Sequence, residues 1–591
     1  MSFIHSNLSG TSPSPDFVLA VTQKSINASL KHRLYRSSQD EELIWFGYGD
    51  NGQPKEYDFL TMRFRAGNTN FFDIPEGARV KENKVLENYQ KAGFIQLIRL
   101  KPGIPRVKNL AMLPPVIKFG TDSEILYTLL FEEFTVITLR GEGPSAQLEY
   151  SRQPLTGIYQ VKVKAGLKFI NIDADPATNK NNSSFSLNGQ GQNRYTLRQL
   201  VADSSKAQII SLPGIDAIGA GSVQEKRLQT LYINLMQKNM IVLGTVALEQ
   251  DPPPTIVNIG TTRYTVPTPR TSTNLPLKDV TFFINHFKGD KPLPQPADDS
   301  RSGFSSLNFA CSVGSGAAVR PASLSWDWIE PKVGKIQADG VLAIRKDAFL
   351  NWLSDLVAPF FRRICLQPSC TVESGWSMTY DLKFAEAGDS QQFKIIPKRT
   401  YPDGFNCVMA LAYQGESSDS CFQVYSWGNL ECRYSVASEI YIKDNKIKFY
   451  TNVNVWLHIN FDSGVTEGNF AKYVIEQVFD LHVNAYGKIQ LQRQPTIISD
   501  KSETYDVSFW TKLISFGRFD DLLDLQKKFK AGYYDSLINN LDGIEKGLNG
   551  AAAMIFPGGN SFVFKDVQFS EGLDLVAHIV HADPDNNTNA N

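Results

Sequence analysis

Two segments of this chain, far apart in the sequence, share one order of apolar and polar positions. Phe17–Leu30 reads FVLAVTQKSINASL, and Gly340–Leu353 reads GVLAIRKDAFLNWL. In each segment an apolar run leads into apolar positions three or four residues apart, which predicts a short strand followed by an amphipathic helix. The repeat distance is too long for a solenoid unit of about 20 to 50 residues, so the echo predicts a duplicated domain. Chance similarity between two strand-to-helix junctions is the alternative.

The first half of the chain shows mainly the alternation of strands. A proline-rich stretch, residues 251–303, argues against central strands or helices there, apart from one last strand at Asp279–Phe287. We place the boundary between the halves in this stretch and predict domains at 1–295 and 303–582. The other predicted elements are helices at Thr22–Arg36 and Val223–Lys238 and strands at Phe94–Leu100, Ile125–Leu139, Tyr159–Lys164, Leu167–Ile172 and Ile241–Leu248, with a hairpin turn at Ala165 and Gly166.

The second half alternates over longer runs. Leu324–Ile329 reads as a strand with Trp326 and Trp328 on one face. Asp444 and Asn445 tolerate positive φ and predict a tight turn inside a long antiparallel meander. The meander comprises Glu439–Lys443, Lys446–Tyr450, Val453–Ile459, Phe479–Ala485 and Ile489–Leu491.

The strongest helical pattern lies near the end, at Asp521–Leu548. A helix of this length extends about 42 Å at roughly 1.5 Å per residue. Because its single apolar stripe needs a concave partner, we expect the meander and a hairpin formed by Asn560–Lys565 and Asp574–Val580 to wrap around it. The tail, residues 583–591, is predicted to be disordered. The stripe includes Leu525, Phe529, Tyr533, Leu537, Leu541, Ile544 and Leu548.

Composition narrows the class of protein. The chain has 591 residues, of which 42% are hydrophobic and 20% charged, and it is rich in β-branched and aromatic residues, so we expect an α+β fold with more strand than helix. The 60 basic and 61 acidic residues leave no positive excess, which disfavours nucleic acid as a partner. The N-terminus has no signal-peptide pattern and no apolar run reaches about 20 residues, so we expect a cytoplasmic protein, with any membrane contact peripheral. The six cysteines are then expected to be reduced.

The order of these elements resembles the tubular lipid-binding (TULIP) superfamily. More narrowly, it is similar to the forty-seven-kilodalton and OrfX-type proteins of clostridial neurotoxin clusters and their bacterial and fungal relatives. The residues that carry the resemblance are Asp16–Asn27, Leu324–Trp328 with Gly340–Ile344, and Phe556–Asp566. This chain is longer than the forty-seven-kilodalton proteins.

The resemblance implies two TULIP-like halves, each with a long curved antiparallel sheet wrapped around a long amphipathic helix. It implies a non-enzymatic protein that binds a lipid or another apolar ligand, with the helix stripe as the lipid-binding candidate. It also implies an accessory role beside a toxin, a protein partner from the same cluster and release by a non-classical route. No cofactor and no metal site are predicted.

Two rival interpretations stay open. In the first, the protein is a scaffold that binds a partner and whose interior is filled by side chains. In the second, it is a hydrolase that uses a surface histidine, His482 or His578. His578 and His581 are three residues apart on one predicted strand, so they point to opposite faces and cannot share an ion. We therefore name no catalytic residue.

Overall fold

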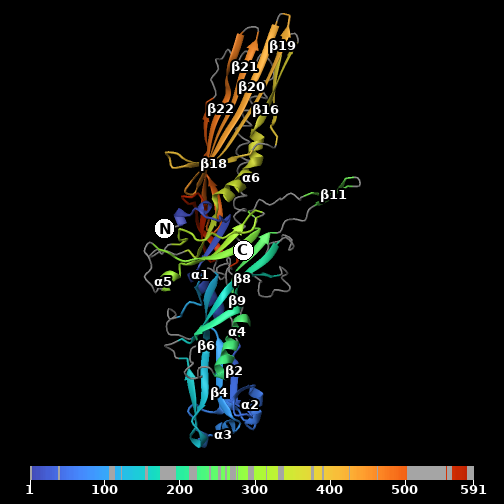
Figure 1. Cartoon of the computed structure of the whole chain (residues 1–591). Helices are drawn as coiled ribbons and strands as arrows, with labels where there is room; N and C mark the ends of the chain where they lie inside the picture. The colour runs from blue at the N-terminus through green and yellow to red at the C-terminus, as the bar shows by residue number, and fades with distance from the viewer. Residues whose placement is uncertain are drawn as a thin grey trace.

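The computed structural model is an elongated molecule with three large antiparallel sheets (Figure 1). A ten-stranded sheet occupies one end, a six-stranded sheet the middle and a seven-stranded sheet the other end. The structure describes residues 3–36, 40–105, 113–121, 123–153, 158–172, 195–211, 222–238, 241–249, 255–259, 262–266, 275, 277–289, 299–314, 316–329, 338–374, 378–388, 392–424, 426–461, 464–501, 554–555 and 562–581.

The middle sheet joins strands from the two halves of the chain. Every neighbouring pair in it is antiparallel. The two strands of the sequence echo, β1 and β15, lie side by side at its centre. In order across the sheet, the strands are β13 (Asp279–Asn285), β14 (Ser306–Ser312), β1 (Phe17–Thr22), β15 (Gly340–Ile344), β27 (Leu575–His581) and β26 (Phe562–Phe569).

The register of the two central strands follows an approximate two-fold axis. Phe17 lies opposite Ile344 at one end, and Val21 lies opposite Gly340 at the other. The sequence echo matches Phe17 with Gly340 and Val21 with Ile344, so the axis carries each pair onto the other. The strands beside them obey the same relationship, because β14 pairs with β1 as β27 pairs with β15.

The residues that precede the two echo strands repeat one hydrogen bond. The Val313 backbone N–H donates to Asp16 Oδ2 at 3.1 Å. The His581 backbone N–H donates to Asp339 Oδ2 at 2.8 Å. Each aspartate therefore caps the end of a strand that pairs with the echo strand directly after that aspartate. The contact repeats as the sequence echo does, and the division into domains at 1–295 and 303–582 stays a prediction.

The ten-stranded sheet is built mainly from the first half of the chain. Its last strand, β25, comes from the second half and pairs with β10. In order, the sheet contains β25 (Met554–Ile555), β10 (Val242–Glu249), β9 (Tyr195–Ser211), β8 (Gln160–Ile172), β6 (Glu124–Arg140), β4 (Phe94–Pro102), β2 (Glu42–Tyr48) and β3 (Pro54–Tyr57), with β5 (Ile117–Phe119) and β7 (Gln147–Arg152) also paired to β6.

The seven-stranded sheet confirms the predicted meander. Asp444 has φ of +51° in the turn between β20 and β21, as its tolerance of positive φ predicts. The sheet contains β18 (Lys394–Thr400), β19 (Asn406–Gln423), β20 (Ser426–Lys443), β21 (Lys446–Phe461), β22 (Gly464–Val483) and β23 (Ile489–Arg493), with β24 (Ile497–Asp500) also paired to β22. Two further hairpins are β11 (Thr255–Ile259) with β12 (Thr262–Val266) and β16 (Leu366–Ser374) with β17 (Met378–Glu386).

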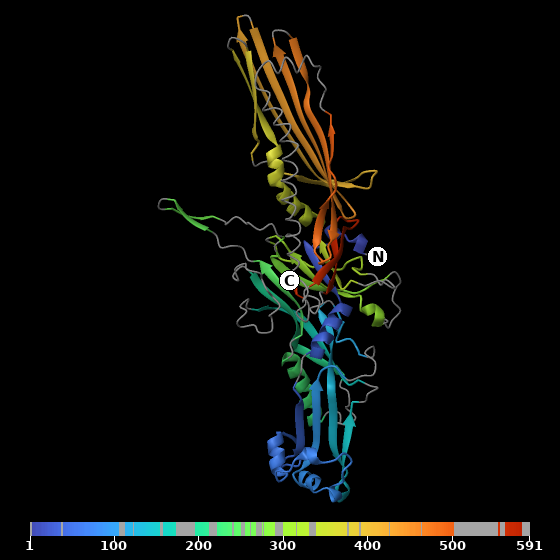
Figure 2. The ribbon, with the colours of Figure 1, turned by 180° about the vertical axis from the view of Figure 1, so that it is seen from behind.

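Helices are few among the described residues, and the predicted α+β class with more strand than helix is confirmed. In both views α6 runs alongside the seven-stranded sheet (Figures 1 and 2). The α-helices are α1 (Gln23–Arg36), α2 (Phe59–Arg65), α3 (Lys84–Lys91), α4 (Val223–Lys238), α5 (Asp299–Ser302) and α6 (Lys346–Ile364). The short 3₁₀ turns are η1 (Phe3–His5), η2 (Leu8–Gly10), η3 (Phe71–Asp73), η4 (Val80–Glu82) and η6 (Gly143–Ser145). The predicted helix Asp521–Leu548 and the tail 583–591 lie outside the described residues.

One buried apolar cluster runs through all three large sheets. It extends from Ile44 in β2 through Leu342 in β15 to Phe449 in β21. A second cluster covers the opposite face of the middle sheet and includes Val18 and Val341. The two faces of β1 and β15 are therefore both buried, which explains why these strands read as continuous apolar runs.

Two predicted elements are wrong. Ala165 and Gly166 do not form a turn, because β8 runs on through them and Gly166 lies opposite both Glu124 and Asp203. Leu324–Ile329 is not a strand. Its polar groups bond to other parts of the chain instead: the Lys288 backbone N–H donates to Asp327, and Trp328 Nε1 donates to Asn308 Oδ1 at 2.7 Å.

Candidate functional site

The face of the seven-stranded sheet that points into the protein is apolar along nearly its whole length. Alternate residues of β20, β21 and β22 are buried, and the residues between them are more exposed. These strands are 18, 16 and 20 residues long. At about 3.3 Å per residue, the apolar face extends roughly 50 to 60 Å. Its buried residues include Leu430, Cys432, Tyr434, Val436, Ile447, Phe449, Val453, Val455, Leu457, Ile459, Phe470 and Phe479.

Helix α6 covers one part of this face. Its buried positions Phe349, Leu353, Val357 and Phe361 recur every four residues, which produces a single apolar stripe. The Tyr434 hydroxyl of β20 donates to the carbonyl oxygen of Ile364, the last residue of α6. This bond fixes the end of the helix against the inner face.

The hairpin of β16 and β17 covers a second part. The backbone N–H of Cys370 donates to Ser417 Oγ at 2.9 Å, and that of Val372 donates to Asp419 Oδ2 at 2.7 Å. Side chains of β19 therefore accept hydrogen bonds from backbone N–H groups of β16, in place of the backbone-to-backbone hydrogen bonds of paired strands. The hairpin is held beside the sheet by these contacts.

The residues predicted to line a lipid site lie on the segment Asp521–Leu548, outside the described residues. The prediction that they bind lipid therefore remains untested. They are Leu525, Phe529, Tyr533, Leu537, Leu541, Ile544 and Leu548.

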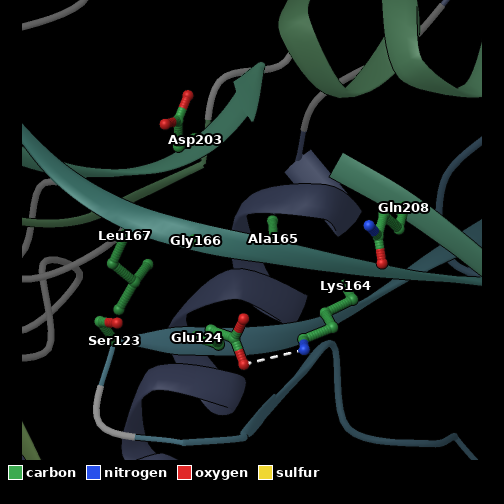
Figure 3. Close-up of a pocket in the computed structure, with 8 residues that line it drawn as sticks. All are labelled: Ser123, Glu124, Lys164, Ala165, Gly166, Leu167, Asp203 and Gln208. Atoms are coloured by element: carbon green, nitrogen blue, oxygen red, sulfur yellow. Dashed lines mark ion pairs between the residues drawn. The ribbon is translucent and has the colours of Figure 1, made fainter. Parts of the chain in front are cut away.

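A polar cavity of about 520 Å³ lies in the ten-stranded sheet, where β9 departs from regular pairing with β8. Figure 3 shows Glu124 of β6 and Lys164 of β8 facing each other at 3.0 Å. The lining is formed by Ser123, Glu124, Lys164, Ala165, Gly166, Leu167, Asp203 and Gln208.

Both carboxylates of the cavity are already neutralised by lysines. The hydrogen bond from Lys168, at 2.8 Å, and that from Ser205 lower the pKa of Asp203 to about 2. The hydrogen bonds from Lys164 and Thr121 lower the pKa of Glu124. Because neither group holds a proton near neutral pH, the cavity is poorly suited to general acid catalysis. Its lining suits a small polar molecule better than an acyl chain.

The two histidines of the hydrolase hypothesis are not brought together. His482 lies in β22 of the seven-stranded sheet, whereas His578 lies in β27 of the middle sheet. His578 Nδ1 lies 2.5 Å from Asp566 Oδ1, and the ring contacts Phe3 edge-on at 4.4 Å. His578 is nearly buried rather than exposed on a solvent face, so its description as a surface histidine is wrong. Among the described residues no group of three or more His, Cys, Asp or Glu side chains could hold a metal ion.

A cluster that the sequence did not reveal surrounds His581. Ser29 Oγ lies 3.1 Å from His581 Nε2, and Asp339 Oδ2 lies 3.1 Å from His581 Nδ1. The order of the groups is that of a serine-hydrolase triad, but Ser29 lies inside α1, where backbone N–H groups are used by the helix. The cluster therefore lacks an oxyanion site on its nucleophile and serves to connect α1 with β27. Asp339 directly precedes Gly340, and Asp16 directly precedes Phe17. Extending the sequence echo by one residue toward the N-terminus would therefore have identified Asp339 as a repeated position.

Trp326, Trp328 and Trp352 are buried. Trp326 and Trp328 form an edge-to-face pair with ring centres 5.5 Å apart, and Trp352 lies in α6. Trp376 lies outside the described residues. Among the described residues all six cysteines are unpaired.

Comparisons with known proteins give no family assignment. No protein-family model and no curated protein matches the chain. Thirteen chains of solved structures match. P47 from Clostridium botulinum A2 has a TM-score of 0.38 and 9% identity over 96% of this chain and 97% of that chain. P47 of Clostridium botulinum E1 has the same score and identity over 96% and 99%. A lipopolysaccharide binding protein has a TM-score of 0.24 and 10% identity over 96% and 99%. At these scores the likeness decides neither family nor function.

Among the described helices, none combines the length and the apolar character that crossing a bilayer requires.

Proposed function

We propose that this chain is a non-enzymatic protein with two TULIP-like halves that binds a lipid or another apolar ligand. The observation that carries the proposal is the long apolar inner face of β20, β21 and β22. The described elements that cover it are a helix of 19 residues and the β16–β17 hairpin. The predicted helix Asp521–Leu548 would offer a second apolar stripe to the same face.

The energetics favour a ligand with an apolar chain. Each methylene that moves from water into an apolar site contributes about 0.8 kcal/mol, so a long acyl chain gains enough to offset the cost of ordering it. The described inner face is long in the strand direction, which matches the shape of an extended acyl chain. An accessory role beside a toxin remains a prediction that rests on the resemblance.

The scaffold interpretation is the main rival, and one observation favours it. The apolar residues of the inner face are buried by the protein itself, as in a filled core. The two interpretations differ in what the purified protein carries. A binding protein retains a ligand or takes one up, whereas a scaffold with a filled interior does neither.

Native mass spectrometry of the freshly purified full chain, followed by solvent extraction and lipid identification, tests the proposal. Bound acyl lipid close to one molecule per chain is the expected result. A clean apo mass, together with no uptake of a fluorescent fatty acid or phospholipid, would overturn the proposal and favour the scaffold.

A further inference from the structure

The turn that joins β19 and β20 lies at one end of the elongated molecule (Figure 1). It carries exposed apolar side chains. Phe422 and Val424 are 79% and 81% exposed, and Trp427 is 43% exposed. Phe422 and Trp427 lie directly opposite each other in the antiparallel pair. They point away from the buried inner face, because the inner positions of β20 are Leu430, Cys432 and Tyr434.

Three successive rows of side chains cross the outer face of the sheet below this turn. The first, the aromatic row, is Phe422 with Trp427. The second, the neutral row, carries no charge, and the third, the charged row, is acidic. The neutral row comprises Ser420, Asn429, Asn460 and Val465, and the charged row comprises Glu431, His458 and Glu467.

The order of the rows matches the change in polarity across a membrane surface. Aromatic side chains prefer the boundary between hydrocarbon and headgroups, and charged side chains remain in water. The charged row is four residues from the aromatic row along β20, or about 13 Å. Apolar faces of interfacial proteins enter roughly 5 to 10 Å. The aromatic row can therefore enter the bilayer while the charged row stays outside it.

The charges near the turn favour a neutral bilayer over an anionic one. The ten residues from Ser420 to Asn429 include no acidic or basic residue. In the charged row, Glu431 is paired with Arg433 at 2.7 Å and Glu467 with His458 at 3.0 Å. No basic excess is present there to attract anionic lipids.

The size of the exposed group argues against a protein partner. An aromatic side chain buries about 150 to 250 Å². Two of these and one valine do not by themselves reach the roughly 800 Å² that each side of a stable protein interface buries, so a protein partner would also have to cover the polar surface around them. A bilayer has no such minimum area, because each inserted side chain contributes independently.

We propose that this end of the seven-stranded sheet is a membrane-docking tip, which inserts Phe422, Val424 and Trp427 into the surface of a zwitterionic bilayer. The tip lies on the outer face, so docking is separate from the binding of a ligand on the inner face. The inference therefore goes beyond the proposed function and does not depend on it.

Flotation of the full chain with small phosphatidylcholine vesicles tests the tip. The wild-type protein should float, and its bound fraction should not fall when the salt concentration is raised. The double variant Phe422→Ser/Trp427→Ser should bind at least about tenfold less, because both aromatic side chains are lost. Both positions are on the surface, so the variant should fold, and circular dichroism checks this.

A matched control is available at the opposite end of the molecule. Leu60 and Phe64 of α2 are 70% and 74% exposed, so Leu60→Ser/Phe64→Ser removes a comparable apolar area. This control should float as the wild type does. The proposal would be overturned if the tip variant floats as well as the wild type, or if the control variant loses as much binding as the tip variant. It would also be overturned if the wild type does not float. A different result would assign the patch to a second copy of the chain: a wild-type protein that does not bind vesicles and is a dimer in solution, with a tip variant that is a monomer.

Mass spectrometry of the tip variant separates this proposal from the proposed function. The variant should lose vesicle binding and keep any co-purified lipid. A wild-type protein that floats but carries no ligand would contradict the proposed function and support the tip.

Discussion

Leu19 and Leu342 lie directly opposite each other at the centre of the antiparallel pair formed by β1 and β15. The sequence echo matches these two residues with each other, so the approximate two-fold axis of the middle sheet passes between them. Because β1 pairs with its own repeat, β15, the two segments of the sequence echo lie side by side. The middle sheet is therefore the element that connects the two ends of the molecule.

The close approach of the two echo strands predicts a large effect of Gly340→Ala. A Cβ at this position would lie 2.2 Å from the carbonyl oxygen of Ala20, and the backbone of β1 cannot move away without breaking the sheet. We expect the free energy of unfolding to fall by about 3 kcal/mol, at the upper end of typical overpacking costs. Urea denaturation of the full chain measures the loss.

Gly314→Ala provides the control for this prediction, because a Cβ there would meet no atom within 4 Å. It should leave the free energy of unfolding within about 0.5 kcal/mol of the wild type. If Gly340→Ala is as stable as Gly314→Ala, the close pairing of β1 and β15 is incorrect.

Asp574 holds the N-terminal segment against the second half, and its removal should release that segment. Its Oδ2 accepts hydrogen bonds from Ser6 Oγ at 2.6 Å and from the Leu8 backbone N–H at 2.7 Å. Its Oδ1 accepts one from the Lys346 N–H, in the first turn of α6, at 3.2 Å. Asp574→Ala leaves these buried donors unsatisfied, so we expect a loss of about 3 kcal/mol. Hydrogen exchange should show faster exchange at residues 3–10.

The neighbouring exposed pair gives the comparison. Glu571 pairs with His5 at 2.9 Å, and both side chains are largely exposed. Glu571→Ala should therefore change stability by less than about 1 kcal/mol. Unchanged exchange at residues 3–10 in Asp574→Ala would show that other contacts hold this segment.

The local elements could be predicted from the sequence wherever a periodic pattern or a turn residue was present. The strand and helix at Phe17 and Gly340 and the turn at Asp444 depend on neighbouring residues alone, and they were predicted correctly. The pairing of β1 with β15 could not be predicted from either strand, because pairing depends on contacts between distant segments. The echo indicated duplication but not that the copies would touch.

The two wrong elements have specific causes. Gly166 is typical of a turn, but it lies between Glu124 of β6 and Asp203 of β9. Pairing with these two strands keeps β8 extended. Trp326 and Trp328 alternate with polar residues as in a strand, but Asp327 accepts backbone donors from Lys288 and Gly289, which holds the segment as a loop. Neither contact leaves a local signal in the sequence. The polar cavity beside Gly166 was missed for the same reason.

Asp203 predicts how stability depends on pH. Its pKa is lowered to about 2, mainly by the hydrogen bond from Lys168, against about 3.9 in an unfolded chain. A lowered pKa gives stability that is fully present above about pH 4 and is lost as the pH falls toward 2. After allowance for the half-exposed Lys168, we expect Asp203→Asn to cost about 1 to 2 kcal/mol at pH 7 and almost nothing near pH 2. Urea denaturation over this pH range provides the measurement.

Asp50→Asn is the matched variant for this experiment, because its carboxylate is fully exposed and 3.5 Å from Arg65. It should stay close to the wild type at every pH. The free energies of unfolding of Asp203→Asn and the wild type should differ less as the pH falls. If this difference stays constant from pH 7 to pH 2, ionisation of Asp203 is not its cause.

Leu537 discriminates between a ligand site and a filled core. If its side chain lines a ligand site, Leu537→Trp fills that space and weakens uptake of a fluorescent fatty acid, with only a modest loss of stability. Leu537→Asp should prevent folding if the helix is part of a filled core, because a charge then replaces a buried apolar contact. Leu60→Trp, at an exposed leucine of α2, makes the same change of size and should leave uptake unaltered. A folded Leu537→Trp protein with unchanged uptake would show that no ligand occupies that position, and the apolar inner face would then be explained by core packing alone.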